Sequence, residues 1–522
     1  MAQGLLESSA GSSLLATTAN NHFGIKTGGS WTGPFVLRTD DAPNEQFRKY
    51  NSAAESFEDH SLFLTGRKRY SSLFALAPND YKGWAYGLKN CGYATNPKYA
   101  ELLIGVIERY DLAQYDRYEH VAENVEGADL VVYSAAIAEE NPEMVRAKEL
   151  GIPTASRAEI LGLLMDEYPN SIAISGTHGK TTTTSMVSVI LEKNKLEPTI
   201  LVGGYLSEID GNYKVGDGSF FVTEACEYRD SFLSLRPYIE VILNIDSDHL
   251  DYFKDIEHIV RSFDSFTKNI KPGGNIIAYD ANPFINRIIK DIEGAITYGY
   301  NPSCTYAISD VKFDTNGMPS FNISYRGKPQ GTMELSVPGE HNILNATAAF
   351  ACCHQLGVAS VDIIRELKLY TGTKRRFDII GKAKDNITVV DDYAHHPTEI
   401  KATLSAAQNL MHNRIWCLFQ PHTYTRTLAL FDDFIDSFKG ADILVLTDIY
   451  AAREKDIYNI SSDKLAERIK LAHPEIEVAY IKDFDEIASK VLAEAECDDL
   501  VITMGAGDIY KVGQIILEKG QA

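Results

Sequence analysis

The chain has 522 residues, 44% of them hydrophobic, and a formal net charge of -22 at pH 7. This length predicts three or four globular domains, and the acidic balance argues against a general nucleic-acid or anionic-membrane partner, although a local phosphate site remains compatible with it. The seven cysteines include no Cys-x-x-Cys pair, so we expect neither a disulfide framework nor a zinc site. No apolar run is long enough to cross a membrane, and the first twenty residues do not form a signal peptide. We therefore expect a cytoplasmic protein without a membrane partner.

Residues 1–118 form short turns and aromatic phrases that do not alternate strands with helices. The phrases AQGLLES (2–8), NNHFGIK (20–26), FRKY (47–50), SFEDH (56–60) and GYATNP (92–97) resemble the N-acetylglucosaminidase domain of bacterial autolysins and flagellar muramidases. The resemblance implies a small, mainly helical, lysozyme-like segment in which Glu7 is the general acid and Tyr93 a candidate to assist it. A solvated Glu7 in an inactive remnant remains the alternative, because the family has further helical sequence before this phrase. Asp40, Asp41 and Glu45 all remain open as a second carboxylate.

From about residue 119 the sequence alternates strands with helices. A buried strand is expected over 128–134, and helices are expected over 142–150 and 157–167. Such alternation predicts a parallel sheet, but about fifty residues are too few for a complete doubly wound domain.

The stretch from Ile172 to Thr184 is an apolar strand followed by a glycine turn and the start of a helix. Backbone N–H groups at such a turn, together with Lys180 and the hydroxyls after it, favour binding of a nucleoside triphosphate. The usual G-x-x-x-x-G-K-[ST] pattern is not met, because Ile174 stands where its first glycine would fall, so the loop is a shortened variant. The alternative is an ordinary strand–turn–helix with a surface lysine.

Further apolar strands are expected over 199–202, 220–224 and 241–245, and ligands of parallel sheets bind beyond such strand ends. Glu224 and His249 follow two of these strands and, with the Thr181 hydroxyl, are expected to surround magnesium ions, although His249 could instead only orient a ligand. A helix is expected from 338 to about 356. Asn342 and Asn345 at its start are either helix caps or contacts to adenine and phosphates.

After about residue 371 the pattern predicts a second doubly wound domain. Its strands are expected over 388–390, 415–419, 443–447, 478–481 and 500–503, with helices over 397–411 and 427–438. Polar clusters follow four strands, at 391–397, 420–426, 448–454 and 504–507, which indicates a substrate-binding rim. For single residues such as Asp391, Thr398 and Arg426, a turn, a cap or a solvated side chain remains the alternative.

Eight phrases of the chain together resemble the Mur ligases: GTHGKTTTTSM (176–186), TEACEYRDSF (223–232), NIDSDHLDYF (244–253), PGEHNILNATAA (338–349), GTKRRFD (372–378), DDYAHHPTEI (391–400), FQPHTYTRT (419–427) and MGAGDIY (504–510). The resemblance implies ATP-dependent joining of L-alanine to the carboxylate of UDP-N-acetylmuramate through an acyl phosphate, for peptidoglycan precursor synthesis, with ATP and Mg²⁺ as cofactors.

The resemblance also implies roles for residues at matching positions. The phosphates would be held by Gly176, Thr177, His178, Gly179, Lys180, Thr181 and Thr182, and the nucleotide also by Asn342, Asn345 and Arg376, the last reaching back from a hinge. Thr181 and Glu224 would bind one magnesium ion, and His249 a second. The amino-acid side would be formed by Asp392, Tyr393, His395, His396, Tyr424 and Arg426.

The expected fold is α/β: a parallel-sheet central ATPase domain and a C-terminal Rossmann-like domain, preceded by the small helical segment. We expect the glucosaminidase-like segment over 1–118, a remnant of the UDP-sugar-binding domain over 119–168, the ATP-binding domain over 169–371 and the amino-acid-binding domain over 372–522. The family's first domain lacks its front half here. Alternatives are a murein tripeptide recycling ligase, a glycosidase, or a chain that binds nucleotide without turnover.

Overall fold

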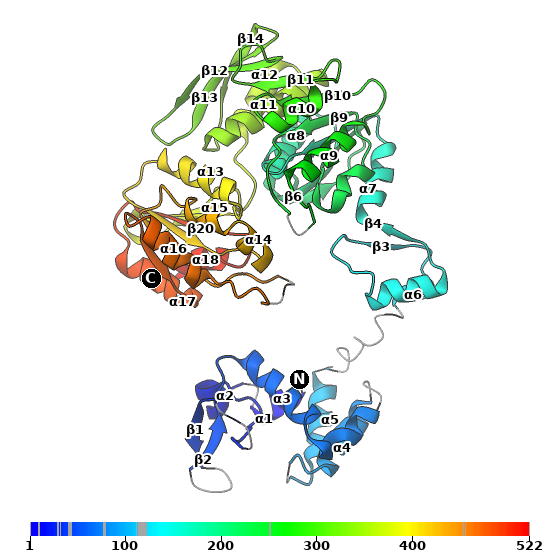
Figure 1. The fold of residues 1–522 in the computed structure, drawn as a ribbon, viewed down its shortest axis with the longest axis vertical. Helices are drawn as coiled ribbons and strands as arrows, with labels where there is room; N and C mark the ends of the chain where they lie inside the picture. Colours follow the sequence, from blue (N-terminus) through cyan, green and yellow to red (C-terminus); the bar gives the residue numbers. More distant parts are fainter. Residues whose placement is uncertain are drawn as a thin grey trace. The chain divides into compact units, whose positions relative to one another are not determined.

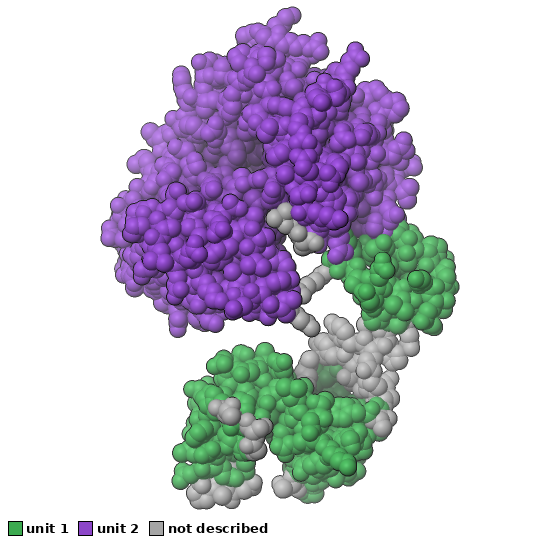
Figure 2. All heavy atoms as spheres, viewed as in Figure 1, with its two compact units in different colours: residues 1–155 green, residues 156–522 purple. Residues whose placement is uncertain are grey.

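The structure is a computed structural model with two compact units, residues 1–155 and residues 156–522 (Figure 2). None of its described helices is both long and apolar enough to cross a membrane. The described residues are 2–8, 11–28, 31, 33–39, 44–76, 80–94, 96–110, 112, 122, 124–249, 252–452, 454 and 456–520.

The first part of the first unit is mainly helical, as predicted. Its small core is built from side chains such as Tyr70, Leu73, Leu88 and Leu103. Its elements are α1 (Ala2–Glu7), α2 (Leu14–Ala19), the antiparallel strands β1 (Phe35–Arg38) and β2 (Glu45–Arg48), α3 (Ala53–Thr65), the 3-10 helix η1 (Lys68–Ala75), α4 (Tyr81–Asn90) and α5 (Tyr99–Arg109).

A second part of this unit contains β3 (Val131–Tyr133), α6 (Pro142–Leu150) and β4 (Thr154–Ser156). Asn141 caps α6 at its start and Gly151, with a φ of 69°, ends it, so the predicted helix is confirmed. The prediction of a buried strand is wrong, because Leu130 is 43% and Val132 50% exposed. The reason is that, among the described residues, β3 pairs only with β4, in a sheet of two strands.

The second unit contains a ten-stranded sheet with the order β14-β13-β12-β11-β10-β9-β5-β8-β6-β7 (Figure 1). Neighbouring strands from β12 to β6 are parallel, which confirms the predicted parallel sheet, whereas β7, β13 and β14 pair antiparallel at the two edges. The strands are β5 (Asn170–Ser175), β6 (Thr199–Leu206), β7 (Gly211–Lys214), β8 (Phe220–Glu224), β9 (Ile239–Ile242), β10 (Asn275–Tyr279), β11 (Ile296–Gly299), β12 (Tyr306–Phe313), β13 (Pro319–Tyr325) and β14 (Lys328–Glu334).

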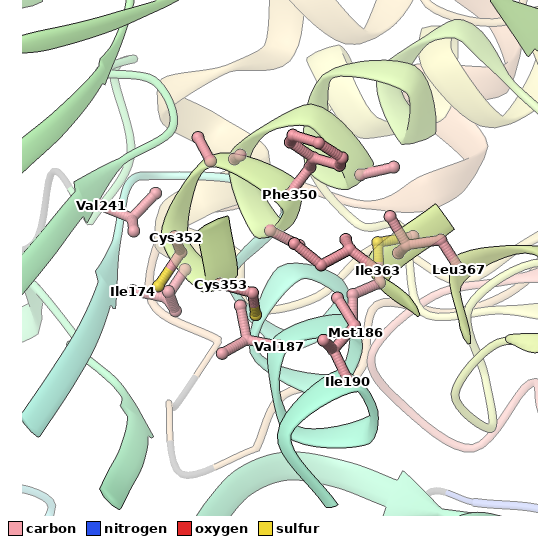
Figure 3. Packing of buried hydrophobic residues seen from close by; sticks show 14 of the residues in the cluster. Ile174, Met186, Val187, Ile190, Val241, Phe350, Cys352, Cys353, Ile363 and Leu367 are labelled. Atoms are coloured by element: carbon pink, nitrogen blue, oxygen red, sulfur yellow. The ribbon is translucent and has the colours of Figure 1, made fainter. Parts of the chain in front are cut away.

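Helices cover both faces of this sheet, so that its central strands are buried on each side. On one face lie α8 (Lys180–Lys193), α11 (Glu340–Gln355) and α12 (Ser360–Leu369), packed against Ile174 and Val241 (Figure 3). The hydrophobic cluster of the other face includes side chains of α7 (Arg157–Asp166), α9 (Ile256–Thr267) and α10 (Pro283–Ile289). Three short 3-10 helices complete the unit: η3 (Ser207–Ile209), η4 (Tyr228–Ser234) and η5 (Lys384–Asn386).

A six-stranded sheet follows in the same unit, with the order β15-β16-β20-β17-β18-β19. All pairs are parallel except β15 with β16. The helix predicted over 427–438 is wrong in detail: Thr423 caps a helix that begins at Tyr424, and the helix breaks at Leu430. The elements are β15 (Asp378–Lys382), β16 (Thr388–Asp392), α13 (Pro397–Gln408), β17 (Ile415–Phe419), α14 (Tyr424–Ala429), α15 (Phe431–Ile435), β18 (Ile443–Leu446), α16 (Ser462–Ala472), β19 (Glu477–Tyr480), α17 (Phe484–Glu494), β20 (Leu500–Met504) and α18 (Tyr510–Gly520).

Glu240 in β9 is fully buried, and this burial raises the pKa of its carboxyl well above the ordinary value of 4.5. Oε1 accepts a long hydrogen bond of 3.4 Å from Ser175 Oγ, and Oε2 has no hydrogen-bond partner among the described residues. Since the unfolded chain releases this proton at a lower pH than the folded chain does, stability should fall as pH rises above the unfolded pKa.

We therefore expect Glu240→Gln to become increasingly stable relative to the wild type as pH rises from 4.5 toward neutrality and beyond, because the amide stays neutral. Urea unfolding midpoints at several pH values measure the difference. Glu293→Gln, at an exposed carboxylate, is the control and should track the wild type. If the urea midpoints of Glu240→Gln and the wild type changed with pH in the same way, Glu240 would not be protonated in the folded protein.

Candidate active site

The loop 176–179 joins the end of β5 to the first residue of α8. Gly179 has a φ of 86°, and a Cβ at this position would lie 2.6 Å from Asn345 Oδ1, so only glycine fits. Gly179 occupies the position before the helix and supplies no side-chain cap. The first N–H groups of α8 are therefore in the arrangement that binds anions.

Lys180 folds back over this loop. Its Nζ donates to Gly176 O at 2.6 Å and Thr177 O at 3.2 Å, and lies 2.8 Å from Glu227 Oε2. Burial lowers the pKa of Lys180, but the Glu227 carboxylate outweighs it, so that the pKa is raised overall. Glu227, whose side chain is only 3% exposed, was missed by the sequence reasoning. The available signal was a second carboxylate three residues after Glu224.

The predicted magnesium ligands lie around the same loop. Glu224 ends β8, and its Oε1 accepts a hydrogen bond of 2.5 Å from the Gly203 N–H. Adjacent Gly204 lies against Thr181, since a Cβ there would be 3.2 Å from Thr181 Cγ2. His249, with a φ of 54°, approaches Glu227 rather than Glu224: its Nε2 is 3.9 Å from Glu227 Oε1.

If Glu224 is the magnesium ligand that the sequence predicts, Glu224→Gln should keep the fold and lose most magnesium-dependent turnover, because the change removes a carboxylate at a half-buried strand end and no core side chain. Turnover measured against magnesium concentration, with thermal melting in parallel, tests this. Glu334→Gln, on the exposed strand β14, serves as the control. Retained activity together with a collapsed fold would make Glu224 a structural residue.

A cavity of about 410 Å³ begins at the loop residues His178, Gly179 and Thr182. Its walls come from both halves of the second unit. The apolar side chains include Leu243, Tyr279, Tyr298, Val337, Tyr370 and Phe377, and the polar ones include Asn342, Asn345, Arg376, Asp392 and Glu399. The cavity is within the size range of small-molecule sites.

Asn342 and Asn345 both line this cavity from inside α11. The reading of these residues as helix caps is wrong, because α11 begins at Glu340 and Gly339 holds the cap position. Asn342 Nδ2 donates to Pro338 O at 2.7 Å, and Asn345 Nδ2 donates to Asn342 Oδ1 at 3.1 Å. His341, a cavity residue that the sequence reasoning missed, has a pKa lowered by burial to about 4.

Arg376 connects the segment between the two sheets with the loop. Its Nη2 lies 3.5 Å from Thr181 Oγ1, and its guanidinium lies 5.2 Å from the Tyr393 ring. Asp392 accepts hydrogen bonds of 2.7 Å from the N–H groups of Phe377 and Ala394. Burial raises the pKa of Asp392 to about 6, although Arg376 opposes the shift.

Of the two histidines after β16, His396 is buried and His395 is half-buried beside the segment that follows β17. Burial lowers the pKa of His395 to about 4, and its Nδ1 lies 2.9 Å from Tyr393 O. Its ring packs at 5.7 Å from that of His422, which belongs to the predicted polar cluster 420–426 but was given no role of its own. Arg426 pairs with Asp248 at 3.0 Å, which excludes the reading of Arg426 as merely solvated.

His396 and Tyr424 occupy two further positions of the predicted rim. His396 Nε2 lies 2.9 Å from Ser247 O, so this ring faces the segment after β9. Tyr424 begins α14 and is half-buried.

The first unit holds its own polar cluster. Tyr99 Oη donates to Glu7 Oε1 at 2.7 Å, and desolvation raises the pKa of Glu7 against the effect of this bond. The Tyr93 ring stacks on that of Tyr99 at 5.8 Å. Glu45 pairs with Lys26 at 2.8 Å, while Asp40 and Asp41 are outside the described residues.

Two parallel-rich sheets, a glycine-flanked phosphate loop and a cavity between polar strand ends define an α/β nucleotide-dependent enzyme fold. Three family models match successive parts of the chain: "Mur ligase family, catalytic domain" at 117–169, "Mur ligase middle domain" at 174–353 and "Mur ligase, glutamate ligase domain" at 375–507. The chain belongs to the Mur ligase family.

Individual relatives are similar over most of their length. The UDP-N-acetylmuramate–L-alanine ligase of Alkaliphilus metalliredigens is 49% identical over 399 residues, 76% of this chain and 86% of the relative. That of Caldanaerobacter subterraneus is 50% identical over 403 residues, 77% of this chain and 87% of the relative. The solved UDP-N-acetylmuramate–alanine ligase of Thermotoga maritima is 27% identical with a TM-score of 0.65, covering 77% of this chain and 87% of that structure.

Residues 1–112 match a different model, described as "Mannosyl-glycoprotein endo-beta-N-acetylglucosaminidase". The resemblance of the first segment to a glucosaminidase is thereby confirmed, and the chain combines parts of two enzyme families.

Proposed function

We propose that the chain joins L-alanine to the carboxylate of UDP-N-acetylmuramate at the expense of ATP, in the cytoplasm, for peptidoglycan precursor synthesis. The observation that carries this proposal is the 410 Å³ cavity that begins at the phosphate loop and extends to the polar strand ends of the second sheet. The printed names of the relatives support the choice of substrates.

On the nucleotide side, loop residues 176–182 bind the phosphates and the apolar cavity walls take the adenine. Asn342 and Asn345 orient the base, and Arg376 approaches the phosphates from the opposite side. Thr181 and Glu224 offer the oxygen atoms that magnesium prefers, with Glu227 behind Lys180, whereas His249 is a less usual ligand. Magnesium, when bound, offsets the charge of the phosphates.

On the acceptor side, the polar residues after β16 and β17 hold the amino acid. Asp392, Tyr393, His395, His396, Tyr424 and Arg426 form this set. If His395 Nδ1 donates its hydrogen to Tyr393 O, Nε2 of the neutral ring is an acceptor that can bind an ammonium group. The Arg426 guanidinium, paired with Asp248, is placed for a carboxylate.

Phosphate release tests the proposal. Purified protein with ATP and magnesium should release phosphate only when UDP-N-acetylmuramate and L-alanine are both added. If the tripeptide L-Ala-γ-D-Glu-meso-diaminopimelate replaces alanine more effectively, the recycling ligase is the correct assignment. ATP binding without release under any of these conditions would leave a nucleotide-binding chain without turnover.

A second candidate function is glycan hydrolysis by residues 1–112, favoured by the family match and by the raised pKa of Glu7. We expect this activity to be weak or nil, because Glu45, a candidate for the second carboxylate, is held by Lys26 at 2.8 Å. A zymogram with peptidoglycan measures it. Clear lysis that is lost in Glu7→Gln, and kept in the control Glu101→Gln at an exposed carboxylate of α5, would overturn this expectation.

A further inference from the structure

The ring of His178, in the middle of the phosphate loop, lies between two carboxylates from different parts of the second unit. Nδ1 is 3.2 Å from Glu399 Oε1, in the first turn of α13, and Nε2 is 3.4 Å from Asp246 Oδ2, in the segment after β9. The side chain is only 14% exposed. A loop residue and an α13 residue that are 221 positions apart are thus in direct contact.

Both ring nitrogens face carboxylate oxygens, and both can donate only when the imidazole is protonated. Burial lowers the pKa of His178, but hydrogen bonds with Asp246 and Glu399 and the charge of Asp248 outweigh it and raise the pKa to about 9. Against the effect of burial, His395 and then His178 hold the pKa of Glu399 well below its ordinary value. His178 is therefore an imidazolium at neutral pH.

This cluster is not a convincing metal site, although His178, Asp246 and His396 offer ligand atoms within 4.8 Å of one another. The imidazolium already supplies the positive charge. Both nitrogens of His396 are also in use: Nε2 lies 2.9 Å from Ser247 O, and Nδ1 accepts from the Thr398 N–H at 3.2 Å.

The start of α13 makes further contacts with the same segment after β9. Thr398 Oγ1 donates to Asp246 Oδ2 at 2.7 Å, next to the bond from His178. The His178 backbone is fixed separately, because its N–H donates to Asn244 Oδ1 at 2.8 Å. The side chain of His178 is accordingly the part of this residue that contacts α13.

We propose that His178 is a positioning residue that couples nucleotide binding at the loop to docking of α13 and the sheet behind it. Gly176 and Gly179, on either side, have φ values of 136° and 86°, and Lys180 and Asn244 hold the backbone between them. The His178–Glu399 bond adds a side-chain link from this loop to α13, which is in place before phosphate arrives. By linkage, bound nucleotide stabilises the docking of α13 by the same factor. This inference rests on the proposed nucleotide site.

A double-mutant cycle of His178→Gln and Glu399→Gln tests the coupling, with ATP affinity measured by calorimetry in magnesium. Each single variant should bind ATP about tenfold more weakly, and the double variant no more weakly than either, because one interaction is lost in all three. Thr398→Val, which removes one neutral hydrogen bond, should cost about threefold. His473→Gln is the matched control, since His473 also lies between two carboxylates, Asp436 and Glu475, but makes no described bond to the loop.

Hydrogen exchange supplies a readout that a purely structural role would not change. ATP should slow exchange of the α13 amides in the wild type and in His473→Gln, and not in His178→Gln. Three results would each overturn the coupling while the proposed function stands. They are additive losses of ATP affinity in the cycle, unchanged ATP affinity in His178→Gln, and hydrogen exchange of α13 in the wild type that is the same with and without ATP. A wild-type protein that binds no ATP would overturn the proposed function itself.

Discussion

Lys180→Ala should abolish ATP binding at concentrations that saturate the wild type. In the proposed site, the ammonium of Lys180 is the charge that the loop offers to the β and γ phosphates, and a charge-assisted contact of this kind contributes on the order of 2 kcal/mol or more, about thirtyfold in affinity. The same change leaves the Glu227 carboxylate, 3% exposed, without its ammonium partner, so a loss of stability is expected as well.

Calorimetric titration with ATP and magnesium measures the first effect and thermal melting the second. The double variant Lys180→Ala/Glu227→Gln should recover stability without recovering ATP binding, which separates the two roles. Lys193→Ala, at the exposed end of the same helix, should resemble the wild type. Wild-type ATP affinity in Lys180→Ala would refute the assignment of the loop.

Replacing residues 1–119 by a complete first domain from a relative should lower the KM for UDP-N-acetylmuramate by about tenfold or more, with ATP affinity unchanged. The relatives are covered over 86% of their length, and the first of the three Mur ligase models matches only at 117–169. Binding energy from the diphosphate and uracil positions the remote carboxylate, so turnover should rise too.

Steady-state kinetics on three chains decide this: the chain as it is, the replaced chain, and residues 120–522 alone as the control for simple removal. The third chain should resemble the first. If the present chain already matches the replaced one at low substrate concentration, either the missing half is dispensable or the glucosaminidase-like segment takes its place.

The central strands were predictable because both of their faces are buried. Residues 172–174 and 415–419 are continuous apolar runs, and both are buried strands in the structure. Strand β15 was not predicted, since it lies at a sheet edge, contains Gly381 and exposes half of Ile379, and so lacks such a run. The burial of β3 was overestimated because the sequence shows a strand's own residues and not how many neighbours it has.

The site residues were likewise predictable only in part. Residues at or shortly after a strand end, such as Lys180 and Asp392, were predictable, because an apolar strand followed by a polar turn marks the edge of a parallel sheet where ligands bind. Partners supplied by distant segments did not: Glu227 for Lys180 and Glu399 for His178 depend on how the chain returns to the loop. The position of Asn342 inside α11 was also ambiguous, because a cap residue and a cavity residue carry the same amide.

The exposed β3–β4 sheet has a consequence for the chain in a crowded cell. Each of its strands presents an outer row of backbone donors and acceptors that no other described strand fills, beside the uncovered side chains of Leu130 and Val132. Such edges recruit strands from other molecules. We therefore expect self-association through residues 131–156 to compete with folding when many copies of the chain are made at once.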